Sequence, residues 1–129
     1  MGKVTAGATV SLDGYIAGPD ETGFEHLFAW FDGGDLEFPF VTDGLASAIE
    51  QARAIAGDRN VVVTPGKITS QCLELGLLDE VSIDLVPVLL GGGVPFVDHL
   101  KAAPILLDGP SLVVEGERVT HLRYTIRRP

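Results

Sequence analysis

The chain has 129 residues, 46% of them apolar, which is enough for one domain with a buried core. Its formal net charge is −9 at pH 7, and this acidity argues against nucleic-acid binding, because that affinity comes mainly from Lys and Arg that neutralise phosphates. A single cysteine, Cys72, excludes an intramolecular disulfide and a cysteine-based metal site.

No apolar run is long enough to span a bilayer, and the first ten residues lack the apolar core of a signal peptide. We therefore expect a soluble, cytoplasmic protein with no membrane partner, folded as a single domain over residues 1–129.

The first half of the chain predicts strands, a long loop and two helices. Residues 4–10 alternate small and β-branched side chains and predict a strand, whereas 11–23 are rich in Gly, Asp and Pro and predict a loop. A short helix over 24–31 and a short strand over 38–43 follow. Thr42 or Asp43 would then cap a second helix, which Gly57 ends. The apolar stripe of that helix consists of Leu45, Ala48, Ile49, Ala52, Ile55 and Ala56.

The second half continues the alternation of strand and helix. A strand over 60–64 is broken by Pro65-Gly66, and a helix over 68–75 is closed by Gly76. An apolar strand over 81–90 ends in a glycine triplet, although Pro87 removes one donor from its ladder and indicates an edge or a bulge. Three further strands are expected over 105–107, 112–115 and 119–127, with a hairpin turn at Glu115-Gly116-Glu117.

This order of elements predicts the fold class. Strands that alternate with helices form a mostly parallel sheet with helices on its faces, and the C-terminal hairpin adds antiparallel strands. The expected fold is an α/β protein, a three-layer α/β/α sandwich with a mixed sheet.

Three loops should meet at the carboxyl ends of the parallel strands, where open α/β sheets bind ligands: 11–22, 64–67 and 91–94. In the middle loop, a strand passes through a glycine turn into a helix, so that backbone amides could bind an anion. Lys67, Thr69 and Ser70 could add donors. Pro65 has no N–H, however, and an ordinary strand-to-helix turn explains the same residues.

The glycine triplet, Gly91 to Gly93, is followed by Val94-Pro95 and not by a helix, so it lacks the dipole of a phosphate loop. Its glycines are better suited to positive φ and to close approach by backbone or ligand. Asp13, just past the first strand, could orient a substrate, or donate a proton if burial raised its pKa. An Asx-turn role is equally compatible with Asp followed by Gly.

Other catalytic chemistry has little support. The histidines His26, His99 and His121 show no metal-ligand spacing, and no nucleophile motif is present. Cys72 is expected to be a core thiol. Redox chemistry in this chain would therefore need an organic cofactor.

Three stretches in this order resemble the riboflavin-biosynthesis reductase C-terminal domain family, which has a dihydrofolate-reductase-like fold. They are TVSLDGYIAGPDE, SQCLELGLLDEVSIDLVPVLLGGGVPF and GERVTHLRYTIRRP, and the resemblance covers nearly the whole chain. It implies an NADPH-dependent reductase of a pyrimidine- or pterin-like small molecule, often a homodimer.

The resemblance also implies site residues. The first strand and the loop after it would face the nicotinamide and substrate, with Asp13 as the catalytic candidate. The turn after the VVV strand would take the cofactor's pyrophosphate, and the glycine triplet would border the cleft. The implied cofactor-binding residues are Ala8, Thr9, Ile16, Ala17, Gly18, Pro65, Gly66, Lys67, Ile68, Gly91 and Gly92.

Two departures from the family pattern bear on cofactor binding. Pro65-Gly66 stands where the family usually has two glycines, which removes one amide donor. A strand-turn-helix segment with a Gly-Arg-Arg-Thr-like motif, expected between the first helix and VTDG, is absent. Two hypotheses follow: an NADPH-dependent reductase, or a shortened, non-catalytic relative that binds a small ligand or forms a dimer.

Overall fold

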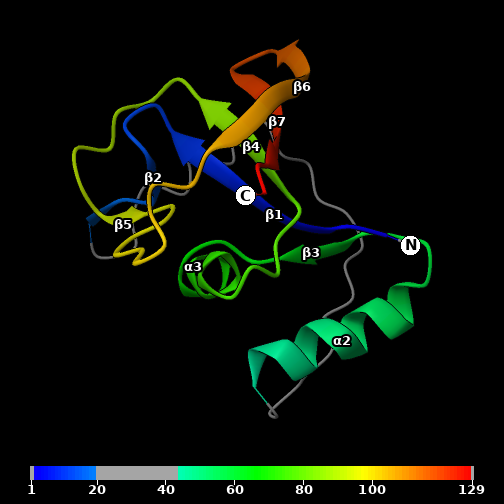
Figure 1. Ribbon diagram of the computed structural model, residues 1–129. Helices are drawn as coiled ribbons and strands as arrows, with labels where there is room; N and C mark the ends of the chain where they lie inside the picture. Colours follow the sequence, from blue (N-terminus) through cyan, green and yellow to red (C-terminus); the bar gives the residue numbers. More distant parts are fainter. Residues whose placement is uncertain (1, 20–43, 129) are drawn as a thin grey trace.

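The computed structural model describes residues 2–19 and 44–128. Its main sheet has five strands in the order β3-β1-β4-β7-β6, and a second, two-stranded sheet pairs β2 with β5 (Figure 1). The strands are β1 (Val4–Ser11), β2 (Tyr15–Ala17), β3 (Val61–Val63), β4 (Glu80–Val86), β5 (Val94–Pro95), β6 (Leu107–Gly116) and β7 (Val119–Ile126). The helices are α2 (Leu45–Ala56) and α3 (Lys67–Glu74).

The sheet is mixed, as the sequence predicts. β1 lies in the middle of its parallel part and pairs with β3 on one side and β4 on the other. β7 then pairs antiparallel with both β4 and β6. The α/β fold with a mixed sheet and an antiparallel C-terminal hairpin is thereby confirmed.

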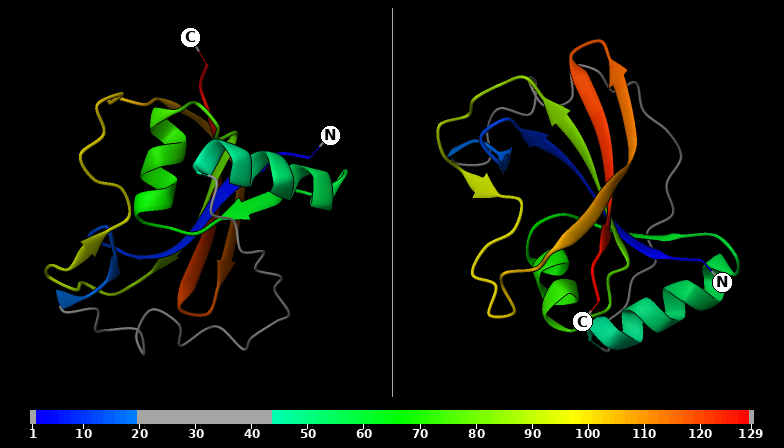
Figure 2. Two further views of the ribbon diagram at one scale, coloured as in Figure 1. Left: turned by 90° about the horizontal axis from the view of Figure 1, so that it is seen from below. Right: turned by 45° about the horizontal axis from the view of Figure 1, so that its top comes forward.

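Both described helices lie on one side of the main sheet (Figures 1 and 2). Val4 and Ala6 of β1 point to that side and pack with Ile49 of α2 and Cys72 of α3 in one apolar core. Alternate side chains of a strand point to opposite faces, so this pattern fixes which face of β1 the helices cover. Cys72 is fully buried, and burial raises the pKa of its thiol, as expected for a core residue.

The third layer of the predicted sandwich depends on the helix expected over 24–31. That helix, the strand expected over 38–43 and the capping residues Thr42 and Asp43 lie outside the described residues. Within the described part, α2 follows Gly44 and ends at Gly57, whose φ of 62° is the left-handed conformation expected of a C-cap glycine.

Several expected boundaries were wrong for physical reasons. β4 ends at Val86 and not at Leu90, because Pro87 cannot donate to the ladder; Leu89 beyond it is 70% exposed. The loop after β1 contains the short strand β2, which the sequence pattern did not indicate. Ile55, assigned to the apolar stripe of α2, is instead exposed.

The C-terminal hairpin also differs from the prediction. The strand expected over 112–115 is part of a longer strand, β6, which begins at Leu107 and has a register irregularity between Asp108 and Leu112; residues 105 and 106, also expected in a strand, precede it. Gly116 pairs with Val119, so the turn lies at Glu117-Arg118, one residue later than expected. Arg118 takes the left-handed φ of 63° that this tight turn requires.

A cluster of charged side chains lies at the end of the sheet where the parallel strands β1 and β4 begin. The Asp79 carboxylate accepts the Val4 N–H over 2.8 Å and an Arg128 N–H over 3.2 Å. The neighbouring Glu80, itself buried, accepts from Lys3 over 2.6 Å. Asp79 and Glu80 therefore bind residues near both the N-terminus and the C-terminus of the chain. They lie away from the carboxyl ends of the parallel strands.

Candidate functional site

The site begins where β3 stops and β1 continues. β3 pairs with β1 only from Val4 to Ala6, whereas β1 runs on to Ser11 beside β4. After Val63 the chain leaves the sheet and enters α3 at Lys67. Within the described residues, no strand covers this side of β1 beyond Ala6.

The direction of the β1 backbone groups follows from its neighbours. Lys3 bonds to the β3 side, since its N–H donates to Asn60 Oδ1 and its oxygen accepts from Val61. Val4 bonds to the β4 side, through Asp79 in both directions. Because a parallel strand alternates in this way, Gly7 and Thr9 direct their backbone groups to the β3 side. The pairing of Ala6 with Val63 uses the Gly7 N–H, so the Gly7 C=O and both backbone groups of Thr9 lie beyond the end of β3.

Asp13 joins the loop after β1 to the loop after β4. Its Oδ1 accepts the Leu90 N–H over 3.1 Å and the Ser11 hydroxyl over 2.5 Å, and its Oδ2 accepts the Gly91 N–H over 2.8 Å. Ser11 is fully buried and its hydroxyl also accepts the Tyr15 N–H over 2.9 Å. Both carboxylate oxygens of Asp13 thus hold backbone or side-chain donors.

These donors favour the charged form of Asp13. The hydrogen bond from Ser11 and then that from Gly91 lower the pKa of the carboxyl below its usual value. This direction is opposite to the raised pKa that proton donation by Asp13 would need. The contact to Ser11 and the bonds to two distant amides show a role in positioning the loops.

The glycine triplet lies directly against the first loop. β5 follows the triplet and pairs antiparallel with β2, and a Cβ on Gly93 would lie only 2.1 Å from the Ala17 carbonyl oxygen. Gly91 and Gly93 have φ angles of 77° and 126°, which side chains rarely allow. The prediction that these glycines serve positive φ and close backbone approach is confirmed.

The turn before α3 is the third component. Gly66, with φ 91°, is the N-cap of α3 and offers no capping side chain, and a Cβ there would lie 3.7 Å from Ile16 of the first loop. The Thr69 hydroxyl, expected as a possible donor to an anion, is used inside the turn itself. Thr69 is fully buried, and its hydroxyl donates to the Thr64 carbonyl over 2.8 Å. The three loops thus converge, as the topology predicted.

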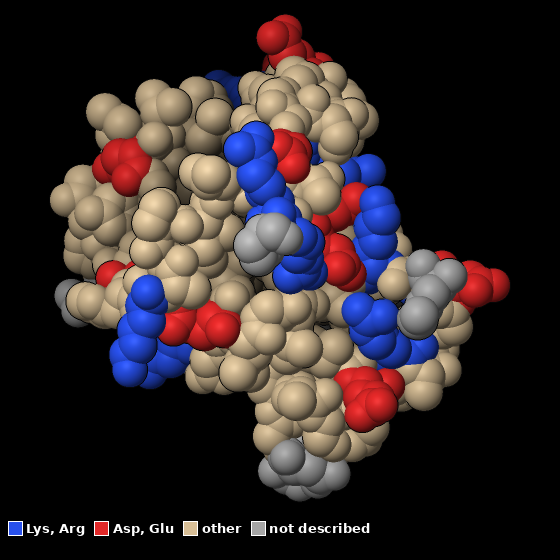
Figure 3. Space-filling model, in the orientation of Figure 1, with Lys and Arg blue, Asp and Glu red and all other residues tan. Residues whose placement is uncertain are grey.

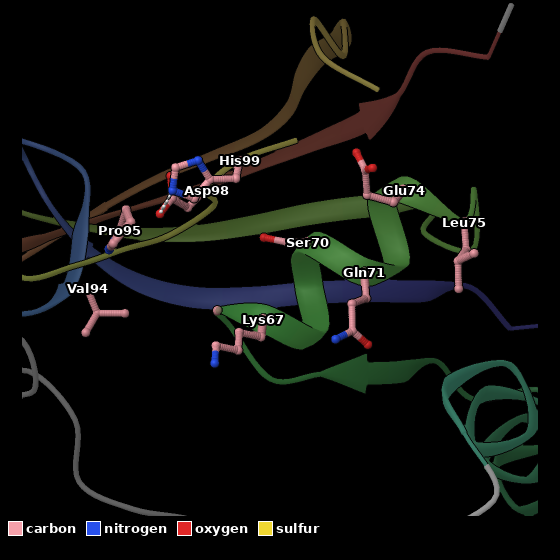
Figure 4. Close-up of a pocket in the computed structure, with 10 residues that line it drawn as sticks. Lys67, Ser70, Gln71, Glu74, Leu75, Val94, Pro95, Asp98 and His99 are labelled. Atoms are coloured by element: carbon pink, nitrogen blue, oxygen red, sulfur yellow. Dashed lines mark ion pairs between the residues drawn. The ribbon is translucent and has the colours of Figure 1, made fainter. Parts of the chain in front are cut away.

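A cavity of about 530 Å³ lies beside this turn, between α3 and the segment that follows β5 (Figure 4). In Figure 4, Ser70 points from α3 across toward Pro95, and His99 Nε2 lies 3.2 Å from an Asp98 carboxylate oxygen. The wall of this cavity is mostly apolar. The lining residues are Gly66, Lys67, Ser70, Gln71, Glu74, Leu75, Val94, Pro95, Asp98 and His99.

Positive charge at this edge is sparse. All nine Lys and Arg of the chain lie in described segments, and Lys67 is the only one that lines the cavity. Lys3 and Arg53 bind acidic residues near the other ends of the strands, and Arg59 donates to carbonyls of α2. Figure 3 shows Lys and Arg interleaved with Asp and Glu on the face that it presents.

No cluster of metal-ligating side chains occurs among residues 2–19 and 44–128. Over the same ranges, no helix is long and apolar enough to cross a membrane. One polar pair was not anticipated: His121 Nδ1 lies 2.6 Å from Asp84 Oδ1, on the neighbouring strand. The register aligns this pair with Thr9 on β1, on the sheet face that points away from α2 and α3.

The structure brings most of the expected site residues together. Ile16 meets Gly66, Gly18 and Ala17 meet the glycine triplet, and Gly91 bonds to Asp13. Gly92 lies beside Pro19, and Lys67 lines the cavity, whereas Ile68 does not. Ala8 directs its backbone to β4, so that only its methyl could contribute. The sequence missed Ser11, although its spacing of two residues from Asp13 is a common turn pattern.

No protein-family model and no curated protein matches the chain. Solved structures do. A riboflavin biosynthesis protein from a Shewanella species is similar at 18% identity with a TM-score of 0.66, over 98% of this chain and 99% of that one. RibD of Acinetobacter baumannii is similar at 11% identity with a TM-score of 0.71, and the likeness covers 98% of this chain and 58% of that one.

The riboflavin biosynthesis reductase Rib7 of Saccharomyces cerevisiae gives a TM-score of 0.63 at 14% identity, over 98% of this chain and 89% of that one. Identities this low establish the fold alone. The chain therefore has the α/β fold of the riboflavin biosynthesis reductases, the dihydrofolate-reductase-like architecture that its three motifs led us to expect.

Proposed function

We propose that the protein is a reductase that transfers a hydride from NADPH to a small pyrimidine- or pterin-like heterocycle. The side of β1 beyond Ala6 carries this proposal. There the Gly7 carbonyl and both backbone groups of Thr9 have no partner strand among the described residues, and they point toward the place where three loops meet. Paired backbone donors and acceptors beside apolar loop residues are suited to orient a planar carboxamide ring. The shared fold supports the same assignment.

The parts of the cofactor would then be distributed over the three loops. The nicotinamide would lie along Thr9, with Ile16, Ala17 and Gly18 beside it. The pyrophosphate would lie at the N-terminus of α3, where the amides of Lys67 and Ile68 are in the first turn and Lys67 lines the adjacent cavity. Gly91 and Gly92 would border the cleft as side-chain-free wall.

Asp13 has a positioning role in this proposal. The bound cofactor would supply the hydride, and catalysis would come mainly from the orientation of two rings held side by side. Because its hydrogen bonds lower the pKa of Asp13, the ionised carboxylate holds the glycine triplet against the first loop. The proton that the reduced substrate requires would come from solvent.

The small number of cationic side chains near the cavity should limit the affinity for a phosphorylated cofactor. Lys67 alone is available to meet either the pyrophosphate or the 2′-phosphate, and Pro65 removes an amide from the turn. Phosphate groups bind most tightly to charged donors, so we expect modest affinity. The same sparse charge favours the second hypothesis, a shortened relative that binds a small ligand without catalysis.

Calorimetric titration of the full chain with NADPH and with NADH tests the proposal. We expect saturable binding of NADPH, reduced about three- to tenfold by Lys67→Gln, in keeping with about 1 kcal/mol for one partly solvated charged contact. Lys101→Gln, an exposed lysine outside the cavity, is the matched control and should leave the affinity unchanged. Flat titrations with both nucleotides would refute the cofactor assignment.

A second measurement separates the two hypotheses. NADPH oxidation, followed by absorbance with aminopyrimidine and pterin substrates, should exceed the rate without protein if the chain is a reductase. Binding without turnover over the whole substrate panel would instead support the non-catalytic, ligand-binding alternative.

A further inference from the structure

Gly7 lies in the middle of β1, where nothing in the described structure requires a glycine. Its φ is outside the left-handed region, so other residues could adopt its backbone conformation. A Cβ on Gly7 would meet one described atom, Val62 Cγ1, at 3.7 Å, which is an ordinary contact. Glycine within a strand weakens it and often marks a place where a ligand approaches the backbone closely. Neither conformation nor packing among the described residues accounts for this glycine.

The hydroxyl of Thr9, two residues further along β1, is buried without a partner. Thr9 is only 8% exposed, and its hydroxyl forms no hydrogen bond within the described part of the chain. Thr5 on the same strand, by contrast, donates to the Val61 carbonyl over 3.5 Å. Buried hydroxyls in proteins are nearly always hydrogen-bonded, so this group lacks the partner that a ligand could supply.

Asp84 lies directly across from Thr9 on β4, and one of its carboxylate oxygens is unused. Asp84 Oδ1 lies 2.6 Å from His121 Nδ1 on β7. A carboxylate only accepts hydrogen bonds, so His121 Nδ1 carries the hydrogen. Asp84 Oδ2 has no hydrogen-bond partner within residues 2–19 and 44–128, and the side chain is 31% exposed. His121 thus fixes the carboxylate and leaves one acceptor oxygen for a ligand.

These features share the sheet face that points away from α2 and α3 (Figures 1 and 2). Neighbouring strands are about 4.8 Å apart, so the paired side chains of Thr9 and Asp84 are within reach of one small ring. Alternate residues of a strand share a face, so Gly7 lies beside them. A hydrogen-bonded pair across two strands could serve the sheet alone. That interpretation explains Asp84 and His121, but neither the unpaired hydroxyl nor the glycine.

We propose that this face of β1 and β4 binds the substrate ring flat over Gly7, and that Asp84 selects the edge of the ring. This inference rests on the proposed function and deepens it. The site fits a ring with two adjacent N–H donors, as in a 2-amino-4-oxo pyrimidine or pterin. Asp84 Oδ2 accepts one donor and the Thr9 hydroxyl accepts the other. A 2-oxo ring would instead place a carbonyl oxygen against the carboxylate, and the two acceptors repel each other.

The positions of the two rings agree with this assignment. The backbone groups of Thr9 that we assign to the nicotinamide leave β1 toward the β3 side. The Thr9 side chain and the site over Gly7 lie on the face of the same strand. A ring over Gly7 would therefore lie next to the nicotinamide, as hydride transfer requires.

Titration of the full chain with pterin and with lumazine, in the absence of cofactor, tests the proposal. These two fluorescent rings differ only at position 2, which carries an amino group in pterin and an oxo group in lumazine. The native protein should bind pterin about tenfold more tightly, as expected for one hydrogen bond to a charged acceptor. Asp84→Asn should reduce this preference to about twofold or less. Equal binding of the two rings, no binding of pterin, or an unchanged preference in Asp84→Asn would overturn the proposal.

Asp108→Asn is the matched control for the loss of charge. Asp108 also bonds to a basic side chain, that of Arg127, and it lies on β6, which β4 and β7 separate from β1. This variant should keep the tenfold preference. If it loses the preference as Asp84→Asn does, the effect is one of net charge and the assignment of Asp84 is wrong.

His121 is a positioning residue in this proposal, and two variants test that role. His121→Leu removes the donor to Asp84, so the preference for pterin should fall. His121→Asn, whose amide can take the place of Nδ1, should retain most of it. Equal preference in His121→Leu and in the native protein would contradict the positioning role.

Gly7→Ala separates ring binding from folding. The added methyl group fits among the described atoms, so the thermal unfolding midpoint should not fall. The same methyl group would stand where the ring lies, so the affinity for pterin should fall at least tenfold. Native-like affinity in a folded Gly7→Ala variant would overturn the proposal. Because these titrations contain no cofactor, flat titrations with NADPH would refute the cofactor assignment and leave this result standing.

Discussion

The Asp13 carboxylate accepts the backbone N–H of Gly91 over 2.8 Å, although the two residues are 78 positions apart in the chain. This bond, with its companion from Leu90, makes the SLDG and LLGGG stretches one structural unit. In the first loop, the Ser11 hydroxyl donates a hydrogen bond to the Asp13 carboxylate. In the second stretch, the Gly91 N–H donates to the same carboxylate, and glycine has no side chain to obstruct this contact. Either stretch alone would be an ordinary turn.

Replacing Asp13 by Asn should lower stability in a pH-dependent way. The folded-state pKa of Asp13 lies below its usual value of 3.8, so the charged form stabilises the fold at higher pH. This contribution is fully present above about pH 5 and is lost as the pH falls below about 3.8 toward the folded-state pKa. Urea midpoints of native protein and Asp13→Asn should therefore differ near neutral pH and converge in acid.

Adding one methyl group to the triplet should separate its two roles. In Gly93→Ala the new Cβ would meet the Ala17 carbonyl oxygen at 2.1 Å, with φ at 126°, and we expect a loss of about 3 kcal/mol or more in unfolding free energy. In Gly91→Ala the Cβ meets nothing within 4 Å, and only the cost of a left-handed φ remains, about 1 kcal/mol. Denaturant unfolding measures both, and equal losses would contradict the close approach at Gly93.

Thr69→Val should show that this hydroxyl is structural. The substitution keeps the shape of the side chain but leaves the Thr64 carbonyl without its donor, at a cost of about 1 to 2 kcal/mol. Ser70→Ala, on the same helix but partly exposed, should change the unfolding free energy by less than about 0.5 kcal/mol. A neutral Thr69→Val would show that the hydrogen bond is dispensable.

Pro65→Gly should strengthen anion binding at the turn before α3 and lower the stability of the protein. The glycine restores an amide donor at the turn before α3, so NADPH affinity should rise, whereas greater freedom of the unfolded chain should cost about 0.5 to 1 kcal/mol. Calorimetry and thermal unfolding on the same preparation measure both effects. Unchanged affinity together with reduced stability would place the pyrophosphate away from this turn.

The fold could be predicted because most of its signals are local. Alternating strands, the stripe of α2 and the glycines that end both helices fixed the elements, and the convergence of three loops followed from the parallel order. The errors arose where tertiary contacts determine whether a strand forms and where it ends. β4 stops at Pro87, and β2 exists only because Val94-Pro95 lies beside it.

The roles of polar residues were harder to predict from sequence. Asp13, Ser11 and Thr69 each had a functional and a structural interpretation, and only their partners distinguish the two. For Asp13 these partners are amides at Leu90 and Gly91, and for Thr69 the partner is a carbonyl five residues earlier. The direction of the Thr9 backbone likewise depends on where β3 ends, which the VVV pattern does not specify.

The central position of β1 also governs the order in which the molecule can assemble. Val4 pairs with Val61 and Thr5 with Glu80, so among the described strands the first has no partner in the main sheet until almost half of the chain is available. β6 and β7, by contrast, are neighbours in sequence and close the shortest loop of the sheet. Local pairs form faster than distant ones. Pulse-labelling hydrogen exchange during refolding should therefore protect the amides of β6 and β7 before those of β1, and the reverse order would show that the parallel core nucleates folding.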